Sequence, residues 1–333
     1  MSYALSFLDK SPIDGSEPAS QALQRSLALA RRAEDLGYRR FWVAEHHNSP
    51  KLASSSPEIL ISHLLAHTRR IRIGSGGVML QHYSAYKVAE NFNLLAALAP
   101  GRVDLGVGKA PGGFPLSTAA LQKAYDPSRK PSFEAQLTEL DGFLRHEHDI
   151  ESTIEELAAF PAPDEPPGRF LLGASPDSAR LAARLGWGFV YAGHIHGDDA
   201  AIAQSLTAYR QAGGKIAVLA ISVITAQTAA IADRFLGDTR RFHLEIKGGQ
   251  NVNVGSHEQA LEYARQAGAT DYRIEERSPR VLRGTPADVH LELQRLHDRF
   301  GIDEFIIDCP VSEGAHRLST IELLAGTRNA AAA

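Results

Sequence analysis

The sequence has a single cysteine, Cys309, among its 333 residues. One cysteine cannot form an intrachain disulfide, and it cannot build a cysteine-rich metal site. The chain also lacks any run of about 18 apolar residues, the length needed to cross a bilayer as a helix. We therefore expect neither a disulfide scaffold nor a membrane protein. Because the N-terminal residues lack the basic and apolar segments of an export signal, we expect a cytoplasmic protein.

Concentrated positive charge is also missing. The chain has 35 Lys and Arg against 39 Asp and Glu, a formal net charge of −4, and its basic residues cluster only in short pairs. Nucleic-acid binding needs a basic surface that neutralises phosphates, so we expect no nucleic-acid partner. The content of 44% hydrophobic and 22% charged residues is that of a globular protein. We expect residues 1–333 to form one domain.

Two kinds of junction recur along the chain. Helix-like segments end at a glycine and pass within a few residues into an apolar strand, as in LGYRRFWVA, LGWGFVYAG and FGIDEFIID. Ser-Pro or Thr-Pro pairs then provide an N-cap and a first helical residue, as in SSPEIL, ASPDSA and GTPADV. Short strand-to-helix and helix-to-strand connections in alternation are typical of parallel βα units.

The fold class predicted from this alternation is α/β, a closed (β/α)₈ TIM barrel. The first strand-to-helix turn, DKSPIDGSE, lacks the G-x-G-x-x-G pattern of open nucleotide-binding sheets. Two segments do not fit the repeat and are predicted insertions: residues 109–131 after strand 4, and residues 239–283 between strands 7 and 8. The eight predicted strands are residues 3–8, 40–45, 71–75, 102–107, 170–174, 188–192, 216–224 and 304–308.

Polar and glycine-rich segments follow the predicted strands, where a TIM barrel carries its chemistry. Adjacent strand residues point to opposite sides, so only one of His46 and His47 should face the barrel interior. In strand order these segments are EHH at 45–47, GSGGVML at 74–80 with His82, Lys109, GASPDS at 173–178, GHIH at 193–196, and Asp308.

A phosphate site is the first interpretation of these strand ends. Gly173, Ala174 and Ser175 lead into a helix N-terminus, whose free N–H groups and dipole favour an anion, and Ser178 adds a hydroxyl. Lys109 is a candidate counter-charge. The same residues also fit an ordinary Ser-Pro helix cap, because SSPEIL shows that the chain uses such caps elsewhere.

A metal site is the second interpretation. Metal-dependent barrel hydrolases use histidines at strand ends with a lysine after strand 4 and an aspartate after strand 8, and Lys109 and Asp308 stand at those places. The first strand, YALSFL, lacks the His-x-His pair with which such hydrolases begin. This interpretation is therefore the weaker alternative.

A flat organic cofactor is the third interpretation. Gly74, Gly76 and Gly77 surround a strand end, where missing side chains let a backbone approach a planar ring. Glycines that only turn the barrel corner fit the same pattern. A glycine-walled slot combined with a phosphate cradle and a histidine describes a site for a phosphorylated heteroaromatic cofactor such as FMN.

The sequence resembles the bacterial luciferase-like, flavin-dependent monooxygenase family, in its uncharacterised bacterial branch. The resemblance rests on three stretches. They are FWVAEHH at 41–47, ASSSPEILISHLLAHTRRIRIGSGGVMLQHYSAYKVAENFNLLAALAPGRVDLGVGKAPGG at 53–113, and LGASPDSARLAARLGWGFVYAGH at 172–194. It implies a TIM barrel that binds FMN at its C-terminal mouth and uses reduced FMN and O₂ to oxygenate a small organic substrate.

The resemblance also implies roles for particular residues. His46 corresponds to the family's acid/base beside the flavin, and the family's non-proline cis peptide falls within residues 74–78. Many relatives have arginine where this chain has Lys109, which keeps the charge but loses the bidentate fork. The implied cofactor-binding residues are His46, Gly74, Ser75, Gly76, Gly77, Val78, His82, Lys109, Gly173, Ala174, Ser175 and Ser178.

Partners follow from the same resemblance. We expect electrons to arrive as diffusing FMNH₂ from a separate NAD(P)H:flavin reductase, and we expect a homodimer paired through the helices after strands 2 and 3. Phe7, Val78 and Phe114 are expected to shield the flavin from water. Some family members instead use the deazaflavin F420 for hydride transfer, and this cofactor is the main alternative.

Overall fold

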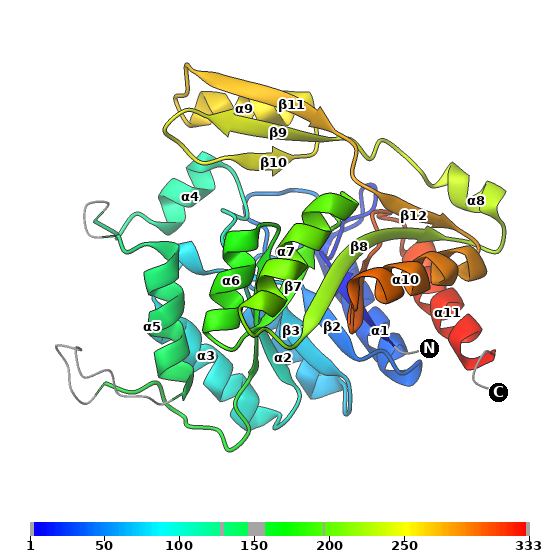
Figure 1. Ribbon diagram of the computed structural model, residues 1–333, viewed down its shortest axis with the longest axis horizontal. Helices are drawn as coiled ribbons and strands as arrows, with labels where there is room; N and C mark the ends of the chain where they lie inside the picture. The colour runs from blue at the N-terminus through cyan, green and yellow to red at the C-terminus, as the bar shows by residue number, and fades with distance from the viewer. Residues whose placement is uncertain (1–2, 127–129, 146–156, 196, 331–333) are drawn as a thin grey trace.

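The computed structural model describes residues 3–126, 130–145, 157–195 and 197–330. Its centre is a closed barrel of eight parallel strands, which confirms the predicted fold class (Figure 1). Closure is complete because β8 pairs with both β7 and β13, and β13 pairs with β1. The barrel strands are β1 (Ala4–Asp9), β2 (Arg40–Val43), β3 (Arg72–Ser75), β5 (Val103–Gly108), β6 (Gly168–Gly173), β7 (Gly188–Ala192), β8 (Ala217–Thr225) and β13 (Glu304–Asp308).

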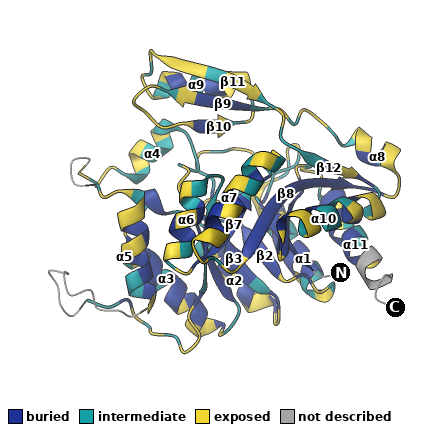
Figure 2. Ribbon diagram, in the orientation of Figure 1, coloured by how far each residue is buried: buried dark blue, intermediate teal, exposed yellow. Residues whose placement is uncertain are grey.

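Helices surround this barrel, with their buried faces turned towards the strands (Figures 1 and 2). In the part of the chain that is described, none of them is long and apolar enough to cross a membrane. The helices are α1 (Ala19–Asp35), α2 (Pro57–His67), α3 (Ala85–Leu98), α5 (Phe133–Arg145), α6 (Pro176–Arg184), α7 (Asp199–Gln211), α10 (Pro286–Phe300) and α11 (Gly314–Ala330).

Predicted capping residues are present at the ends of these helices. Thr285 forms a capping box with Asp288 at the start of α10, and Ser175 caps α6 with its side chain. Gly301 ends α10 in the left-handed conformation, with φ of 59°. Ser56 differs, because it precedes α2 without a side-chain cap hydrogen bond.

Residues with even numbers on the strands face the barrel interior, as strand alternation requires. Leu8 pairs in register with Trp42, and Trp42 pairs with Gly74. The Trp42 and Phe170 rings meet edge to face with centroids 5.3 Å apart. The apolar interior layer consists of Leu8, Trp42, Ala44, Phe170, Val190, Val218, Ala220 and Ile306. Odd-numbered strand residues face the helices and join the larger core.

A buried ionic cluster closes the N-terminal end of the barrel. Asp104 accepts from Arg40 Nε at 2.9 Å and from Arg72 Nη2 at 2.6 Å. Arg40 also pairs with Glu304, which accepts a hydrogen bond from Ser6. Burial raises the pKa of Glu304, while the charge of Arg40 opposes that shift. Because these groups are removed from water, each depends on its partners.

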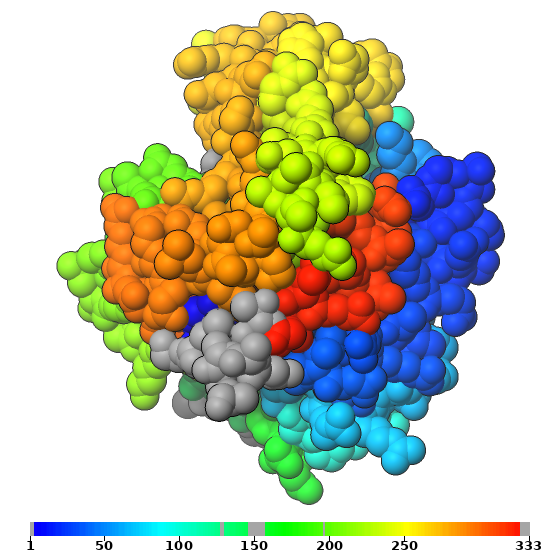
Figure 3. Space-filling view, turned by 90° about the vertical axis from the view of Figure 1, so that its right-hand side faces the viewer, coloured from blue at the N-terminus to red at the C-terminus, as the bar shows by residue number. Residues whose placement is uncertain are grey.

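The second predicted insertion forms a small unit of its own. It is an antiparallel sheet of β9 (Arg241–Ile246), β10 (Val252–Val254) and β11 (Tyr272–Arg277), covered by α9 (His257–Gln266). Figures 1 and 3 show this unit projecting from the barrel. The chain enters it through α8 (Ala229–Arg234) and returns through β12 (Val281–Gly284), which pairs with the end of β8.

The first predicted insertion lies beneath that unit. It contains α4 (Pro115–Leu121), and residues 127–129 of the predicted segment lie outside the described residues. Phe114 meets Tyr263 of α9 with ring centroids 5.6 Å apart. The Leu116 backbone N–H donates to Gln266 at 3.2 Å. Both insertions therefore meet over the mouth, beside the short elements β4 (Val78–Met79) and η1 (Leu80–His82) that follow β3.

The ionic cluster leads to a prediction about stability. Asp104→Ala should lower the free energy of unfolding by about 3–5 kcal/mol, because Arg40 and Arg72 then lose a buried carboxylate. Urea denaturation of the purified variant measures the loss. Asp238→Ala is the matched control, since its partner Arg240 is exposed and the pair is screened by water. Equal losses in both variants would contradict the assignment of stability to the buried cluster.

Candidate active site

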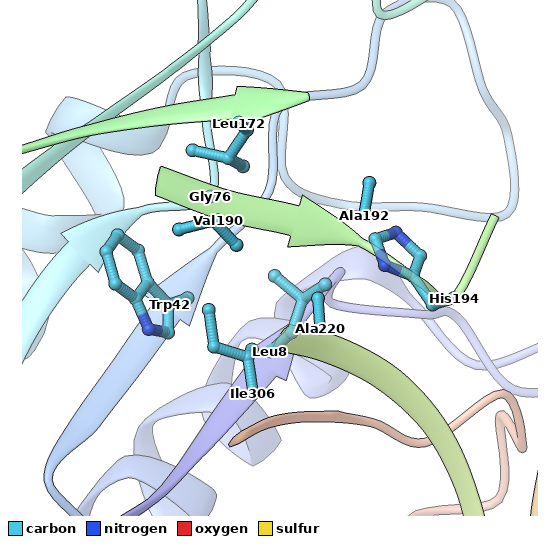
Figure 4. A pocket seen from close by; sticks show the side chains of 9 residues that line it. All are labelled: Leu8, Trp42, Gly76, Leu172, Val190, Ala192, His194, Ala220 and Ile306. Atoms are coloured by element: carbon cyan, nitrogen blue, oxygen red, sulfur yellow. The ribbon is translucent and has the colours of Figure 1, made fainter. Parts of the chain in front are cut away.

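A small apolar pocket opens at the C-terminal mouth of the barrel (Figure 4). The space among its lining side chains, open solvent included, amounts to about 320 Å³. Every lining residue has an even number, so strand alternation alone decides which side chains reach it. The pocket is lined by Leu8, Trp42, Gly76, Leu172, Val190, Ala192, His194, Ala220 and Ile306.

His46 stands two residues beyond the interior-facing Ala44, at the end of β2. Its backbone N–H donates to Ser54, whereas its Nδ1 atom is buried and has no hydrogen-bond partner among the described residues. Burial lowers the pKa of His46 to about 4, and the charge of Lys10 adds to the shift. The imidazole is therefore neutral at neutral pH.

His47 belongs to a different network. Its Nε2 atom lies 2.7 Å from Glu45, which also accepts hydrogen bonds from the Tyr83 hydroxyl at 2.8 Å and the Met79 backbone N–H at 3.0 Å. Burial raises the pKa of Tyr83, and the negative charge of Glu45 adds to the shift. This network ties β2 to the segment after β3, so His47 supports the wall of the mouth.

The three glycines at the end of β3, Gly74, Gly76 and Gly77, differ in what surrounds them. A Cβ on Gly74 would lie 2.9 Å from Asp104, and one on Gly77 would lie 2.7 Å from the Gly106 carbonyl oxygen. These two positions must be glycine because β3 and β5 approach so closely. Gly76 is the glycine that lines the pocket, where a Cβ would come within 3.1 Å of Leu8. The predicted cis peptide is confirmed, between Gly76 and Gly77.

The other predicted residues of this segment are bound within the protein. The Ser75 hydroxyl donates to the Gly106 carbonyl at 2.8 Å and accepts from the Gly106 N–H at 3.0 Å. Val78 is buried in the core between strands and helices. His82 contacts Pro111 O at 2.7 Å and Gln122 at 2.8 Å, so it holds the loop after β5. Burial lowers the pKa of His82.

The predicted phosphate turn joins β6 to α6. Ser175 Oγ accepts the Ser178 N–H at 3.3 Å and lies 3.1 Å from its hydroxyl, so it serves as the N-cap. A Cβ on Gly173 would lie 2.7 Å from Ser178, which explains the glycine there. Ala174 follows Gly173 in the turn and is half-buried, and Lys109 is exposed at the end of β5.

Lys10 and Ser222 are mouth residues that sequence reasoning missed. Lys10 Nζ lies 2.8 Å from Asp308, and the Ser222 hydroxyl donates to the same carboxylate at 3.3 Å. Burial disfavours the charged form of Asp308, but the positive charge of Lys10 outweighs the effect of burial, and the pKa of Asp308 falls to about 2. Their position on the strands was a usable signal. Lys10 follows the pocket-lining Leu8 by two positions, and Ser222 follows the pocket-lining Ala220 by two positions, so each points to the same side as its predecessor.

The three residues expected to shield the flavin do not line this pocket. Phe7 and Val78 pack on the helix side of the strands, and Phe114 packs on the insertion sheet. The apolar wall is instead built by Leu8, Trp42 and the other pocket residues, which point inward.

The lining of the pocket, mostly apolar with one histidine, has the chemical character that a flat, partly apolar ligand needs. At Gly76 a side chain would crowd the pocket, because a Cβ there would meet Leu8 and Trp42. The Nδ1 atom of His46, which has no hydrogen-bond partner among the described residues, is a polar atom at the same mouth. Across the described ranges, no group of three or more His, Cys, Asp or Glu side chains is arranged to hold a metal. His196 of the GHIH segment lies outside those ranges.

Comparisons with known proteins agree with this geometry. A family model described as luciferase-like monooxygenase matches residues 1–303. The N-acetyl-S-alkylcysteine monooxygenase of Bacillus subtilis (strain 168) is 43% identical over 326 residues, which cover 96% of this chain and 96% of that protein. The crystal structure of apo-MsnO8 is 29% identical, has a TM-score of 0.77, and covers 98% of both chains.

Two more distant structures share the fold. The oxygenating constituent of 3,6-diketocamphane monooxygenase from Pseudomonas putida, in complex with FMN, has a TM-score of 0.71 at 16% identity and covers 97% of both chains. An F420-dependent secondary alcohol dehydrogenase has a TM-score of 0.69 at 15% identity and covers 97% of this chain and 98% of that one. This barrel therefore accommodates FMN in one neighbour and F420 in another.

The burial of His46 predicts how stability depends on pH. Between pH 6.5 and 4 the unfolded chain binds a proton at His46 and the folded protein does not, so stability falls as the pH decreases through this window. The loss from His46 should approach about 3 kcal/mol at pH 4, since each pKa unit is worth about 1.4 kcal/mol. Urea denaturation across this range should show a shallower decline for His46→Gln than for the wild type. The exposed control His63→Gln should retain the wild-type slope, and an unchanged slope in His46→Gln would show that burial does not shift His46.

Proposed function

Because the chain belongs to the luciferase-like monooxygenase family, we propose that it is an FMN-dependent monooxygenase that inserts one atom of O₂ into a small organic substrate. The observation that carries this proposal is the apolar pocket at the mouth, with Gly76 on one wall and His46 beside it. When bound, reduced FMN supplies the electrons that activate O₂. The protein must bind the cofactor, orient it and exclude water.

Several parts of the mouth are proposed to hold the cofactor. The pocket around Gly76 would receive the flat ring, while Leu8 and Trp42 keep water from it. The turn from Gly173 to Ser178 would take the phosphate, with the exposed Lys109 as its counter-charge. Gly74, Gly77, Ser75, Val78 and His82 act indirectly in this proposal, because they fix the backbone that carries Gly76 and the loop after β5.

His46 is the proposed catalytic group. A neutral imidazole carries a proton on one ring nitrogen and accepts one on the other, so it can donate or take a proton at the mouth. The buried, unpartnered Nδ1 atom is the position where this exchange would occur. Burial holds His46 in the neutral form at working pH, so a proton that it accepts is readily passed on.

The electron source is proposed to be a separate NAD(P)H:flavin reductase. The first strand-to-helix turn of this chain lacks the glycine pattern that binds a dinucleotide. Reduced FMN would then reach the open mouth by diffusion. The competing proposal is hydride transfer with F420, since one structural neighbour is an F420-dependent enzyme.

N-acetyl-S-alkylcysteines are the first substrates to test. A relative with that name matches nearly the whole chain, so a thioether of this class is a reasonable choice for the oxygenated group. Residues of the two insertions, which meet over the mouth, are proposed to set substrate preference.

We also propose a homodimer formed through α2 and α3. Three large apolar side chains on these helices are exposed: Ile59 at 70%, Leu94 at 51% and Leu98 at 68%. Leu94 and Leu98 are four residues apart and therefore lie on the same helix face. Exposed apolar groups gathered on neighbouring helices are typical of an interface.

The function is tested with purified protein, photoreduced FMN and ¹⁸O₂. Mass spectrometry should find one ¹⁸O atom in the oxidised N-acetyl-S-alkylcysteine, and replacing FMN with F420 should abolish product. His46→Gln should still bind FMN but turn over about 100-fold more slowly, since it lacks the proton-transfer group. The exposed control His63→Gln should match the wild type. Failure of the wild type to bind either oxidised or photoreduced FMN in a titration would refute the proposal, and turnover with F420 alone would favour the competing one.

The dimer is tested by light scattering after size-exclusion chromatography. Ile59→Glu combined with Leu98→Glu should convert a dimer to a monomer, because two charges would be buried at the interface. Leu291→Glu is the control, since Leu291 is 75% exposed on α10, another helix. A wild-type monomer, or a double variant that stays dimeric, would contradict the proposed interface.

A further inference from the structure

Five neighbouring strands place polar groups along one side of the mouth. In each case the polar residue follows an interior-facing residue by two positions on the same face of its strand. Leu8 and Lys10 on and after β1, Ile306 and Asp308 on β13, and Ala220 and Ser222 on β8 are three such pairs. His46 and His194 extend this polar arc on either side. The opposite strands β3, β5 and β6 present small groups instead, including Gly76 and Gly108.

The ion pair in this arc is asymmetric. The Asp308 side chain is 4% exposed and bonded to Ser222, whereas the Lys10 side chain is 27% exposed. The positive end of the pair is therefore partly open to solvent, and the negative end is covered. An ammonium has three N–H donors, and the contact with Asp308 uses one of them.

The surroundings strengthen the effect of this charge. Leu8, Ala220 and Ile306 of the pocket wall are apolar and lie next to the arc, so water screens Lys10 only on its open side. His46 adds no positive charge at neutral pH, since burial lowers its pKa to about 4. Lys109 is exposed and belongs to the proposed phosphate site on β5, away from the arc.

Two oxidation states of flavin differ in the charge of the ring but not in the charge of the phosphate. The oxidised isoalloxazine ring is neutral, and the reduced ring is an anion near neutral pH through loss of a proton from N1. A cation at the phosphate attracts both states equally. A cation beside the ring pocket attracts the reduced state more strongly.

We propose that Lys10, paired with Asp308 at the mouth of the barrel, makes the site select reduced, anionic FMN over oxidised FMN. This inference rests on the proposed use of FMN. A monooxygenase that receives diffusing reduced flavin must capture it from a pool that also contains the oxidised form, and must release the oxidised form after turnover. One charge beside the ring serves both needs, because only differential affinity separates the two states.

The test measures the dissociation constants of oxidised FMN and of anaerobically reduced FMN for each variant. In Lys10→Met, the preference for reduced FMN should fall by about 10-fold, which corresponds to about 30 mV for a two-electron couple. Lys10→Arg should keep the preference. The double variant Lys10→Met with Asp308→Asn should lose it as well, and it avoids leaving an unpaired buried carboxylate. Lys109→Met is the matched control, because it should leave the ratio of the two constants unchanged.

The outcomes separate this inference from the proposed function. If FMN binds but the ratio stays at the wild-type value in both Lys10→Met variants, the inference is overturned. A higher KM for substrate with an unchanged ratio would likewise overturn it and assign Lys10 to a substrate anion. If the wild type binds neither state, the proposed function itself fails.

Discussion

Strand alternation in a closed barrel is the constraint on which the rest of this structure depends. Once eight parallel strands close, every second side chain must lie inside, and each strand contributes a vertical series of such residues. On β1 the series is Ser6, Leu8 and then Lys10; on β13 it is Glu304, Ile306 and Asp308. The barrel interior is therefore layered, with ionic groups at the N-terminal end, apolar groups in the middle and polar groups at the mouth.

The layers support one another. The ionic cluster around Asp104 closes the N-terminal end, and the rings of Trp42 and Phe170 fill the middle. Glycines make room for this packing, since a Cβ on Gly106 would lie 3.1 Å from Trp42 and 2.1 Å from the Ser75 carbonyl oxygen. The close approach of β3 and β5 then leaves Gly76 at the edge of the pocket. A wall without side chains at the mouth is thus a consequence of how the strands pack below it.

The fold could be predicted from the sequence because its signals are local. Glycines follow α1, α6 and α10, Ser-Pro or Thr-Pro pairs begin α2, α6 and α10, and the eight predicted strands match the barrel strands within a few residues. The candidate site could be predicted from the sequence only in part. The predicted residues include Gly76, which lines the pocket, but also Gly74 and Ser75, whose neighbours Asp104 and Gly106 come from a distant part of the chain. The ion pair of Lys10 with Asp308 spans nearly the whole sequence, and only closure of the barrel brings its two residues together.

The central claim is that the pocket at the mouth holds a flavin ring against Gly76, with His46 at its edge and the phosphate at the start of α6. A crystal structure of the protein soaked with FMN tests this claim most directly. The account predicts electron density for the ring in the pocket between Gly76 and the arc of Lys10, His46 and His194, with the phosphate beside Ser175. Density for FMN elsewhere on the protein, with this pocket closed by its own side chains, would contradict it.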